Sequence, residues 1–148
     1  MEQRSQADRL ATRIAELGRL SELAVAGGNW NSYGRVDSVM PAALQAAPPH
    51  LRPSRMRYSP QDGNLTPNYD VDDVLACVGM EDAVALVPAP SDPEGTSANG
   101  RVDRIYLARD LARVAARYVQ QDTRDSEHPA LLLTLNGIPA AGGTLPQR

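Results

Sequence analysis

The chain has 148 residues, with 15 basic residues, 18 acidic residues and a formal net charge of −3. This length suits a single domain with its own core, and the negative net charge argues against a general nucleic-acid-binding surface. The one cysteine, Cys77, excludes an internal disulfide and a paired-cysteine metal site. No stretch reaches the roughly 18 apolar residues that span a bilayer, and the N-terminus lacks the apolar core of a signal peptide, so we expect a cytoplasmic protein without membrane contacts.

The N-terminal segment predicts an amphipathic helix that opens near Ser5 and stops at Gly27 and Gly28. Apolar side chains recur there at alternating three- and four-residue spacing, from Ala7 to Ala24, and charged side chains occupy the opposite face. The two glycines can adopt the positive φ of a helix cap. We expect this helix to cover the core. A dimerising coiled coil is the alternative, but the apolar stripe is short for one.

A glycine-flanked turn over residues 27–34 contains the only tryptophan, Trp30, together with Tyr33. Each of these rings would remove about 150–250 Å² from water if it folded back onto the helices. We therefore expect both rings to hold the turn against the core. The alternative is that they form an exposed centre for protein binding, where tryptophan and tyrosine are enriched. The solvent exposure of Trp30 separates the two interpretations.

The same turn reads Asn-Trp-Asn-Ser-Tyr-Gly over residues 29–34. It resembles the N-W-D-S-Y-G motif of small, mostly uncharacterised proteins from bacterial genomes, plasmids and phages, with Asn31 in place of the usual aspartate. The resemblance covers about residues 20–70 and implies a short helix, a proline-rich connection and a hairpin after the turn. It implies no chemistry, because that family has no settled role. A weaker similarity, over residues 104–112, is to the strand-into-helix ending of some immunity proteins of polymorphic toxin systems.

Beyond the turn, the sequence predicts a short helix and then a hairpin. The helix covers residues 38–47, with Pro41 tolerated in its first turn. Residues 55–58 and 64–66 flank Asp62-Gly63, a dipeptide typical of tight hairpins.

The middle of the chain predicts a further helix, a strand and a loop. Apolar residues at helical spacing indicate a helix over residues 70–79, with Asp70 as its cap. Residues 83–87 are apolar and predict a buried strand. Residues 88–100 are rich in proline, glycine, serine and asparagine, and predict a mobile loop.

The C-terminal part predicts the remaining elements. Residues 102–107 indicate a strand that leads into a helix over residues 108–121. Residues 130–135 are apolar apart from Thr134, so we expect a strand in the centre of a sheet. Residues 137–148 predict a flexible tail. The expected fold is α+β, with one domain over residues 1–136: a small antiparallel sheet of four or five strands, packed by two longer helices.

The sequence offers no converging set of catalytic residues, so we expect a protein that is not an enzyme and holds no cofactor. His50 and His128 each stand close to prolines and fit no nucleophile, metal or acid–base pattern. We expect Cys77 to be a small buried thiol. The carboxylates between residues 70 and 82 could hold a hard cation, but they lack the spacing of a calcium-binding loop, and we expect no metal site.

Charge is distributed unevenly along the chain. Residues 58–100 hold eight acidic residues and no arginine, whereas both flanking segments carry net positive charge. This predicts an acidic surface that docks on a basic protein partner, as an immunity or inhibitor protein does, because complementary fields speed encounter. The candidate partner-binding residues are Asp70, Asp72, Asp73, Glu81 and Asp82, together with Trp30 and Tyr33.

Two alternatives to this function stay open at the level of sequence. The motif resemblance suggests a structural or accessory component of a phage or plasmid. The spacing of Arg109, Arg113 and Arg117 on the expected helix suggests a basic ridge that could contact nucleic-acid phosphates. The negative net charge disfavours this last interpretation.

Overall fold

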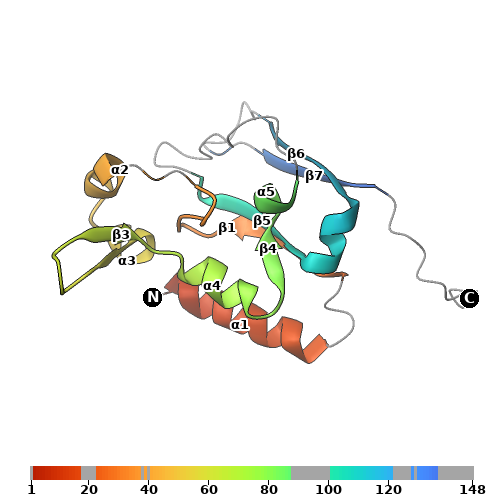
Figure 1. Ribbon diagram of the computed structural model, residues 1–148, viewed down its shortest axis with the longest axis horizontal. Coiled ribbons are helices and arrows are strands. Elements are labelled where there is room, and N and C mark those ends of the chain that lie inside the picture. Colours follow the sequence, from red (N-terminus) through yellow and green to blue (C-terminus); the bar gives the residue numbers. More distant parts are fainter. Residues whose placement is uncertain are drawn as a thin grey trace, which may run out of the picture.

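A computed structural model of the protein describes residues 2–17, 23–37, 39, 41–87, 101–121, 128 and 130–136. Helices and antiparallel strands are mixed, as expected for an α+β fold (Figure 1). In chain order the elements are α1 (Glu2–Leu17), β1 (Val25–Asn29), α2 (Pro41–Ala46), α3 (Arg52–Arg55), β2 (Met56–Tyr58), β3 (Leu65–Pro67), α4 (Asp70–Ala76), β4 (Met80–Asp82), α5 (Ala83–Leu86), β5 (Asp103–Ala108), the 3₁₀ helix η2 (Arg109–Val114), β6 (Ala115–Gln121) and β7 (Ala130–Leu135).

The strands do not form the expected single sheet of four or five strands. Among the described residues they form one three-stranded sheet, in the order β1-β5-β4, and two separate two-stranded ladders, β2-β3 and β6-β7. In Figure 1 the β2-β3 hairpin extends from one end of the molecule, and β6-β7 lies toward the other. Residues 115–121, which the sequence predicts to be helical, form strand β6 instead, and β1 and β5, which pair in the three-stranded sheet, are distant in sequence.

The central strand β5 separates two apolar clusters. On one face Tyr106 packs with Trp30, Leu75 and residues of α1 in a cluster that includes the fully buried Ala7. On the other face Leu107 packs with α5 and is approached by side chains of the β6-β7 ladder. Because β5 side chains alternate between the two faces, α1 and α4 pack on one side of the sheet, and α5, η2 and the β6-β7 ladder pack on the other.

The first helix is shorter than expected. It ends at Leu17, and Gly27 and Gly28 lie in β1, where they pair with Ile105 and Arg104 of β5. The helix-cap interpretation of these glycines is therefore wrong. Ala24 and Ala26 are two positions apart, as on one face of a strand, and both pack on the first cluster. Ala24 also fits the helical spacing of the preceding segment, so the sequence does not reveal where the strand begins.

The packing of α1 supports the core-facing interpretation over the coiled coil. Ala7, Ala11 and Ile14 are buried on one side of the helix, and α1 packs against α4 (Figure 1). No described helix has the length and hydropathy needed to cross a bilayer.

The segment after the turn confirms the expected helix and hairpin. Helix α2 covers part of the predicted range, and Ser38, where the predicted range begins, lies outside the described residues. Strands β2 and β3 pair in antiparallel register, and Gly63 has a φ of 71° in the connecting turn. Helix α3 was not expected from the sequence.

Replacement of Gly63 by alanine tests the turn. Non-glycine residues in the left-handed region cost roughly 1–2 kcal/mol, so we expect Gly63→Ala to lower the free energy of unfolding by about 1 kcal/mol. Gly63→Asn should lose less, because asparagine tolerates this conformation. Urea unfolding of both variants measures the difference, and equal losses would contradict the argument.

Helix α4 confirms the predicted helix for residues 70–76, but it ends three residues earlier than expected and its N-cap differs. Asp70 is not the cap: the N-cap position belongs to Tyr69, without a side-chain bond, and the Asp70 amide donates to Asn68 Oδ1 at 3.0 Å. Asp70, Asp72 and Asp73 all lie in the first turn, where the helix dipole favours carboxylates.

Two expectations for the second half of the chain are wrong. Residues 83–87 contain the short helix α5, not a strand; Asp82 caps this helix by accepting from the Val84 amide at 3.1 Å. The expected helix over residues 108–121 does not form: Ala108 is the last residue of β5, and the rest form η2 and β6. Alanine and arginine favour helices locally, but pairing of β6 with the leucine-rich β7 overrides that preference.

The strand at residues 102–107 is confirmed as β5, and that at residues 130–135 as β7. Strand β7 is not central, because in the described structure it pairs with β6 alone, and Leu132 is 49% exposed. The expected loop at residues 88–100 and the expected tail at residues 137–148 lie outside the described residues.

Candidate functional site

The two rings of the turn are core residues. Trp30 is 8% exposed, meets Tyr106 edge-to-face with 5.4 Å between ring centroids, and donates its indole N–H to the Arg104 carbonyl at 3.3 Å. Tyr33 is 2% exposed and packs in a second cluster with Leu44. This confirms the expectation that the rings hold the turn against the core, and neither ring is an exposed binding centre.

Beneath the turn, Arg104 of β5 is completely buried. Its Nη1 donates to Asp72 Oδ1 at 2.9 Å, and its Nη2 donates to Ser32 Oγ at 2.5 Å. The guanidinium also lies over the ring of Tyr106, 5.4 Å from the centroid. Its Nε is buried with no hydrogen-bond partner among the described groups. A charge removed from water in this way is tolerated only when it is paired.

Asp72 connects Arg104 to the turn and to Tyr106. One carboxylate oxygen accepts from Arg104 and from the Tyr106 hydroxyl, and the other accepts from the Arg35 amide at 2.7 Å. Burial raises the pKa of the Tyr106 hydroxyl far above its ordinary value; the charge of Arg104 opposes this shift and the carboxylate of Asp72 adds to it. Tyr106 therefore stays protonated and acts as a hydrogen-bond donor.

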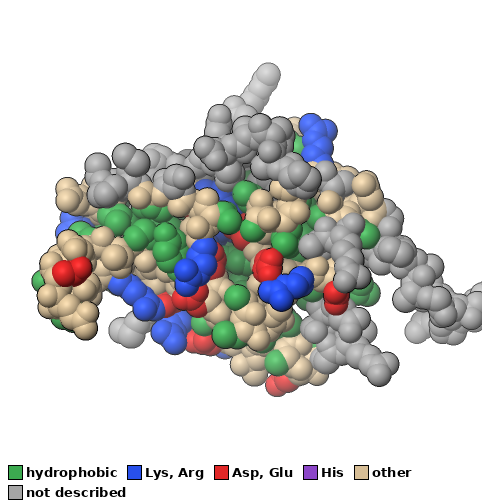
Figure 2. All heavy atoms as spheres, in the orientation of Figure 1, with side chains coloured by type: hydrophobic (Ala, Val, Ile, Leu, Met, Phe, Trp, Pro, Cys, Tyr) green, Lys and Arg blue, Asp and Glu red, His purple; other side chains and the backbone are tan. Residues whose placement is uncertain are grey.

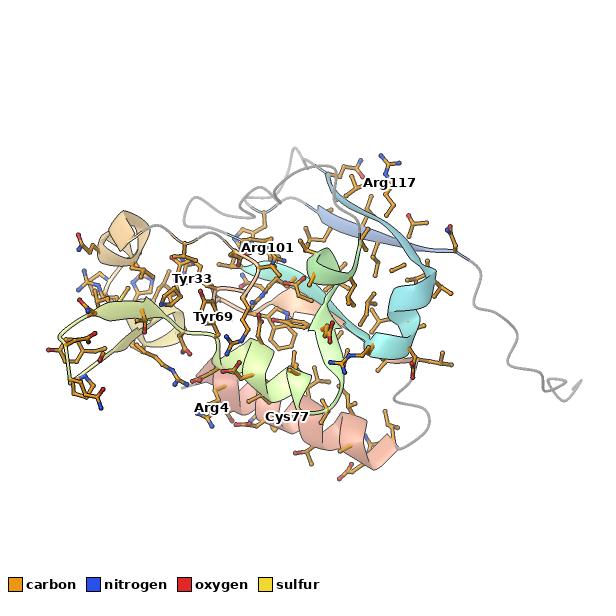
Figure 3. All side chains as sticks on the ribbon, in the orientation of Figure 1. Arg4, Tyr33, Tyr69, Cys77, Arg101 and Arg117 are labelled. Carbon is orange, nitrogen blue, oxygen red and sulfur yellow. The ribbon has the colours of Figure 1, made fainter. Side chains whose placement is uncertain are left out.

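A second buried arginine, Arg101, is labelled near the middle of the molecule in Figure 3. It lies between two carboxylates. Nη1 and Nη2 donate to the two oxygens of Asp82 at 3.2 and 2.5 Å, and Nε donates to Asp37 Oδ1 at 2.8 Å. Burial alone would lower the pKa of Arg101, but the hydrogen bonds and charges of Asp82 and Asp37 outweigh it and raise the pKa. The bidentate geometry is that of a strong charge-assisted pair.

Gly34 closes the turn over both arginines. A side chain at this position would place its Cβ 2.9 Å from Arg101 Nη2, 3.0 Å from Arg104 Nη1 and 3.1 Å from Asp37 Oδ2. The Gly34 amide donates to the same Asp37 oxygen at 2.6 Å. We call the whole assembly the arginine–aspartate network; its members are Ser32, Asp37, Asp72, Asp82, Arg101, Arg104 and Tyr106.

The candidate acidic residues do not form an uncompensated acidic surface, so that expectation is wrong. Besides the pairs of Asp72 and Asp82, Asp70 pairs with Arg4 at 3.7 Å and with Arg57, Asp73 pairs with Arg35 at 2.5 Å, and Glu81 pairs with Arg109. Figure 2 shows acidic and basic side chains side by side across one face. The arginines of the flanking segments neutralise the five candidate carboxylates.

The expected basic ridge does not form, because residues 108–121 are not one helix. Arg109 lies in η2 beside Glu81, and Arg117 lies on β6 opposite Thr134, exposed at the outer side of the ladder (Figure 3). The side chain of Arg113 lies outside the described residues.

The remaining candidate chemical groups are dispersed. His50 is exposed, and His128 Nδ1 lies 2.6 Å from Asp103 Oδ2. Cys77 is exposed after the last residue of α4, so the expectation of a buried thiol is wrong. In the described parts of the chain, no group of three or more His, Cys, Asp or Glu side chains is arranged to hold a metal ion.

Sequence reasoning missed the network because its members are far apart in the chain. Ser32 and Arg104 are 72 positions apart, and Asp37 and Arg101 are 64 apart. One feature of the sequence points toward it. An acidic segment without arginine lies between two arginine-rich segments, which is consistent with ion pairs within the chain as well as with attraction of a basic partner.

The chain was compared with protein-family models, with curated proteins and with solved structures, and it matches none of them.

Proposed function

We propose that the protein is a non-enzymatic accessory protein that acts by binding another protein through the tip of the β2-β3 hairpin. The observation that carries this proposal is the exposure of Tyr58, at 66%, and of its cross-strand partner Leu65, at 40%. Aromatic side chains are enriched at the centres of protein interfaces. An exposed aromatic–aliphatic pair at the end of a projecting hairpin suits that role.

The hairpin has one apolar face that continues from the core to the tip. Met56 and Pro67 form the pair at its base, and Met56 is buried in the cluster of Tyr33 and Leu44. Two residues further along each strand, Tyr58 and Leu65 point to the same side, because strand side chains alternate. The buried base holds the tip in place, so a partner would meet a preorganised surface.

The arginine–aspartate network supports the non-enzymatic part of the proposal. Every carboxylate oxygen of Asp72 and Asp82 accepts a hydrogen bond from an arginine, a backbone amide or Tyr106. A carboxylate with its oxygens occupied in this way is poorly placed to take a substrate proton or bind a cation. These groups hold the turn, α4 and the sheet together.

The hairpin suits partner binding better than the acidic residues do. Asp72 and Asp82 have side chains that are 10% and 4% exposed, and Asp73 and Glu81, the more exposed pair, already contact arginines. A basic partner would have to displace those arginines. The proposals of an immunity protein or a phage component are supported by sequence resemblance alone. The nucleic-acid alternative depended on a row of arginines along one helix, and that helix does not form.

The double variant Tyr58→Ser/Leu65→Ser tests the proposal. Because both side chains are exposed, we expect the free energy of unfolding to change by less than about 1 kcal/mol. Loss of a central aromatic contact should weaken partner binding by at least about tenfold. Immobilised protein, host lysate and quantitative mass spectrometry measure which proteins are retained.

The matched control is Leu132→Ser, which alters a similarly exposed side chain on β7. We expect it to retain the same partners as the unaltered protein. If the double variant retains them equally well, the hairpin is not the binding surface.

A further inference from the structure

Strand β1 forms an open edge of the three-stranded sheet. Among the described residues it pairs with β5 alone. The Trp30 amide donates to the Val102 carbonyl and the Ala108 amide donates to the Ala24 carbonyl, both at 2.9 Å. The even-numbered residues of this segment therefore direct their backbone groups toward β5. By antiparallel alternation, the N–H and C=O groups of Val25, Gly27 and Asn29 point away from β5.

Within the described part of the chain, this edge lacks the features by which proteins protect exposed strands. Such edges are usually very short, charged, interrupted by proline or covered. The opposite edge, β4, has three residues, including Glu81, which pairs with Arg109. Strand β1 has five uncharged residues, of which four are exposed, and a Cβ added at Gly28 would meet nothing within 4 Å.

We infer that β1 accepts an extended, uncharged segment of a partner protein as a fourth strand, bound mainly through its backbone. The adjacent glycines present no side chains, which allows another backbone to approach closely. Leu23 and Val25, 55% and 53% exposed, offer apolar contact at the N-terminal end of the edge. Main-chain hydrogen bonds supply affinity in this mode, and such side-chain contacts supply selectivity.

A second copy of this chain fits the edge less well than a separate partner. Antiparallel pairing of two β1 strands centred on Gly27 would place Val25 of each copy opposite Asn29 of the other. Neither end would then gain an apolar pair, although cross-strand pairs stabilise sheets.

The edge is also separate from the hairpin tip, which lies at the end of the molecule (Figure 1), so this inference does not depend on Tyr58.

The test uses the full chain and a fluorescein-labelled peptide of alternating threonine and valine. A peptide of the same length with proline at alternate positions cannot form a strand ladder and serves as the control ligand. Fluorescence anisotropy should show binding of the first peptide only. Amide hydrogen exchange should slow at Val25, Gly27 and Asn29 when that peptide is added, and should stay unchanged at the other β1 amides.

A matched pair of variants separates the edge from the fold. Gly27→Pro removes an outward-facing N–H and should weaken peptide binding at least about tenfold while leaving the thermal midpoint close to its original value. Gly28→Pro removes an N–H that faces β5 and should lower the thermal midpoint instead.

Three results would overturn the inference. The first is that the unaltered protein does not bind the peptide, and the second is that Gly27→Pro binds it equally well. The third is that the three outward amides already exchange slowly without peptide and the protein sediments as a dimer, because a second copy would then occupy the edge. If Gly27→Pro does not fold, the exchange data on the unaltered protein decide the question. Partner binding through Tyr58 is measured in a separate experiment with the hairpin double variant, and its outcome does not change the interpretation of the peptide-binding results.

Discussion

Replacing Arg104 with methionine is expected to lower the free energy of unfolding by about 3–5 kcal/mol, because breaking a buried ion pair leaves an uncompensated charge in the interior. Arg104 is completely buried, and its loss would leave Asp72, with a 10% exposed side chain, without its cationic partner. Ser32 would lose its donor as well. Urea unfolding followed by circular dichroism measures the change, with the slope checked for constancy.

The control for this variant is Arg109→Met, which breaks an ion pair of the same chemistry at the surface. The Arg109 side chain is 68% exposed, and exposed pairs contribute roughly 0–1 kcal/mol. The large difference between the two variants is the expected result. An equal loss in the free energy of unfolding for both variants would show that the buried ion pair stabilises the protein no more than the exposed one.

Gly34→Ala is the second substitution with a large expected effect, at about 1–3 kcal/mol of lost stability. One methyl group would come within 3.1 Å of Arg101, Arg104 and Asp37. Flexible arginine ends often move aside for such a group. Here they are held by carboxylates within the interior, so the added atom must distort the ion pairs or the turn, as overpacking does in a core.

Gly28→Ala is the matched control, because a Cβ there would meet nothing within 4 Å. Alanine at an unstrained position restricts the unfolded chain, so we expect stability to stay level or to rise by up to about 1 kcal/mol. Thermal and urea unfolding should rank the proteins as Gly28→Ala at or above the unaltered chain and Gly34→Ala below it. The reverse order would show that Gly34 is not closely packed.

The elements that could be predicted from sequence are those with strong local signals. Helix α4 follows the helical spacing of its valines and Leu75, and the β2-β3 hairpin follows Asp62-Gly63. Strands β5 and β7 follow from their apolar residues. In each of these cases the neighbouring residues are enough to decide the conformation, because the turn chemistry or the apolar period lies within the element.

The wrong expectations share a different cause. Residues 115–121 have helix-favouring alanine and arginine, but β7 offers them a ladder that begins with Ala115 opposite Leu135. Gly27 and Gly28 look like a helix cap until β5 provides their strand partner. Local propensity is a weak guide wherever a distant segment supplies the hydrogen bonds.

The site could be predicted only in part. The large aromatic side chains of Trp30 and Tyr33 predict burial against the core, and both are buried. The bonds of Ser32 and Gly34 could not be predicted, since neither residue has a local pattern that identifies a distant arginine. The separation of acidic and basic segments along the sequence favours an external basic partner, whereas in the structure these carboxylates pair with arginines of the same chain.

The arrangement of the network has a consequence for synthesis on the ribosome. Ser32, Asp37, Asp72 and Asp82 precede Arg101 and Arg104 in the order of translation. A nascent polypeptide that ends before these arginines carries three carboxylates destined for the interior without their cations. Truncated products should therefore stay open and be degraded quickly, and the turn should order only after the central strand has emerged.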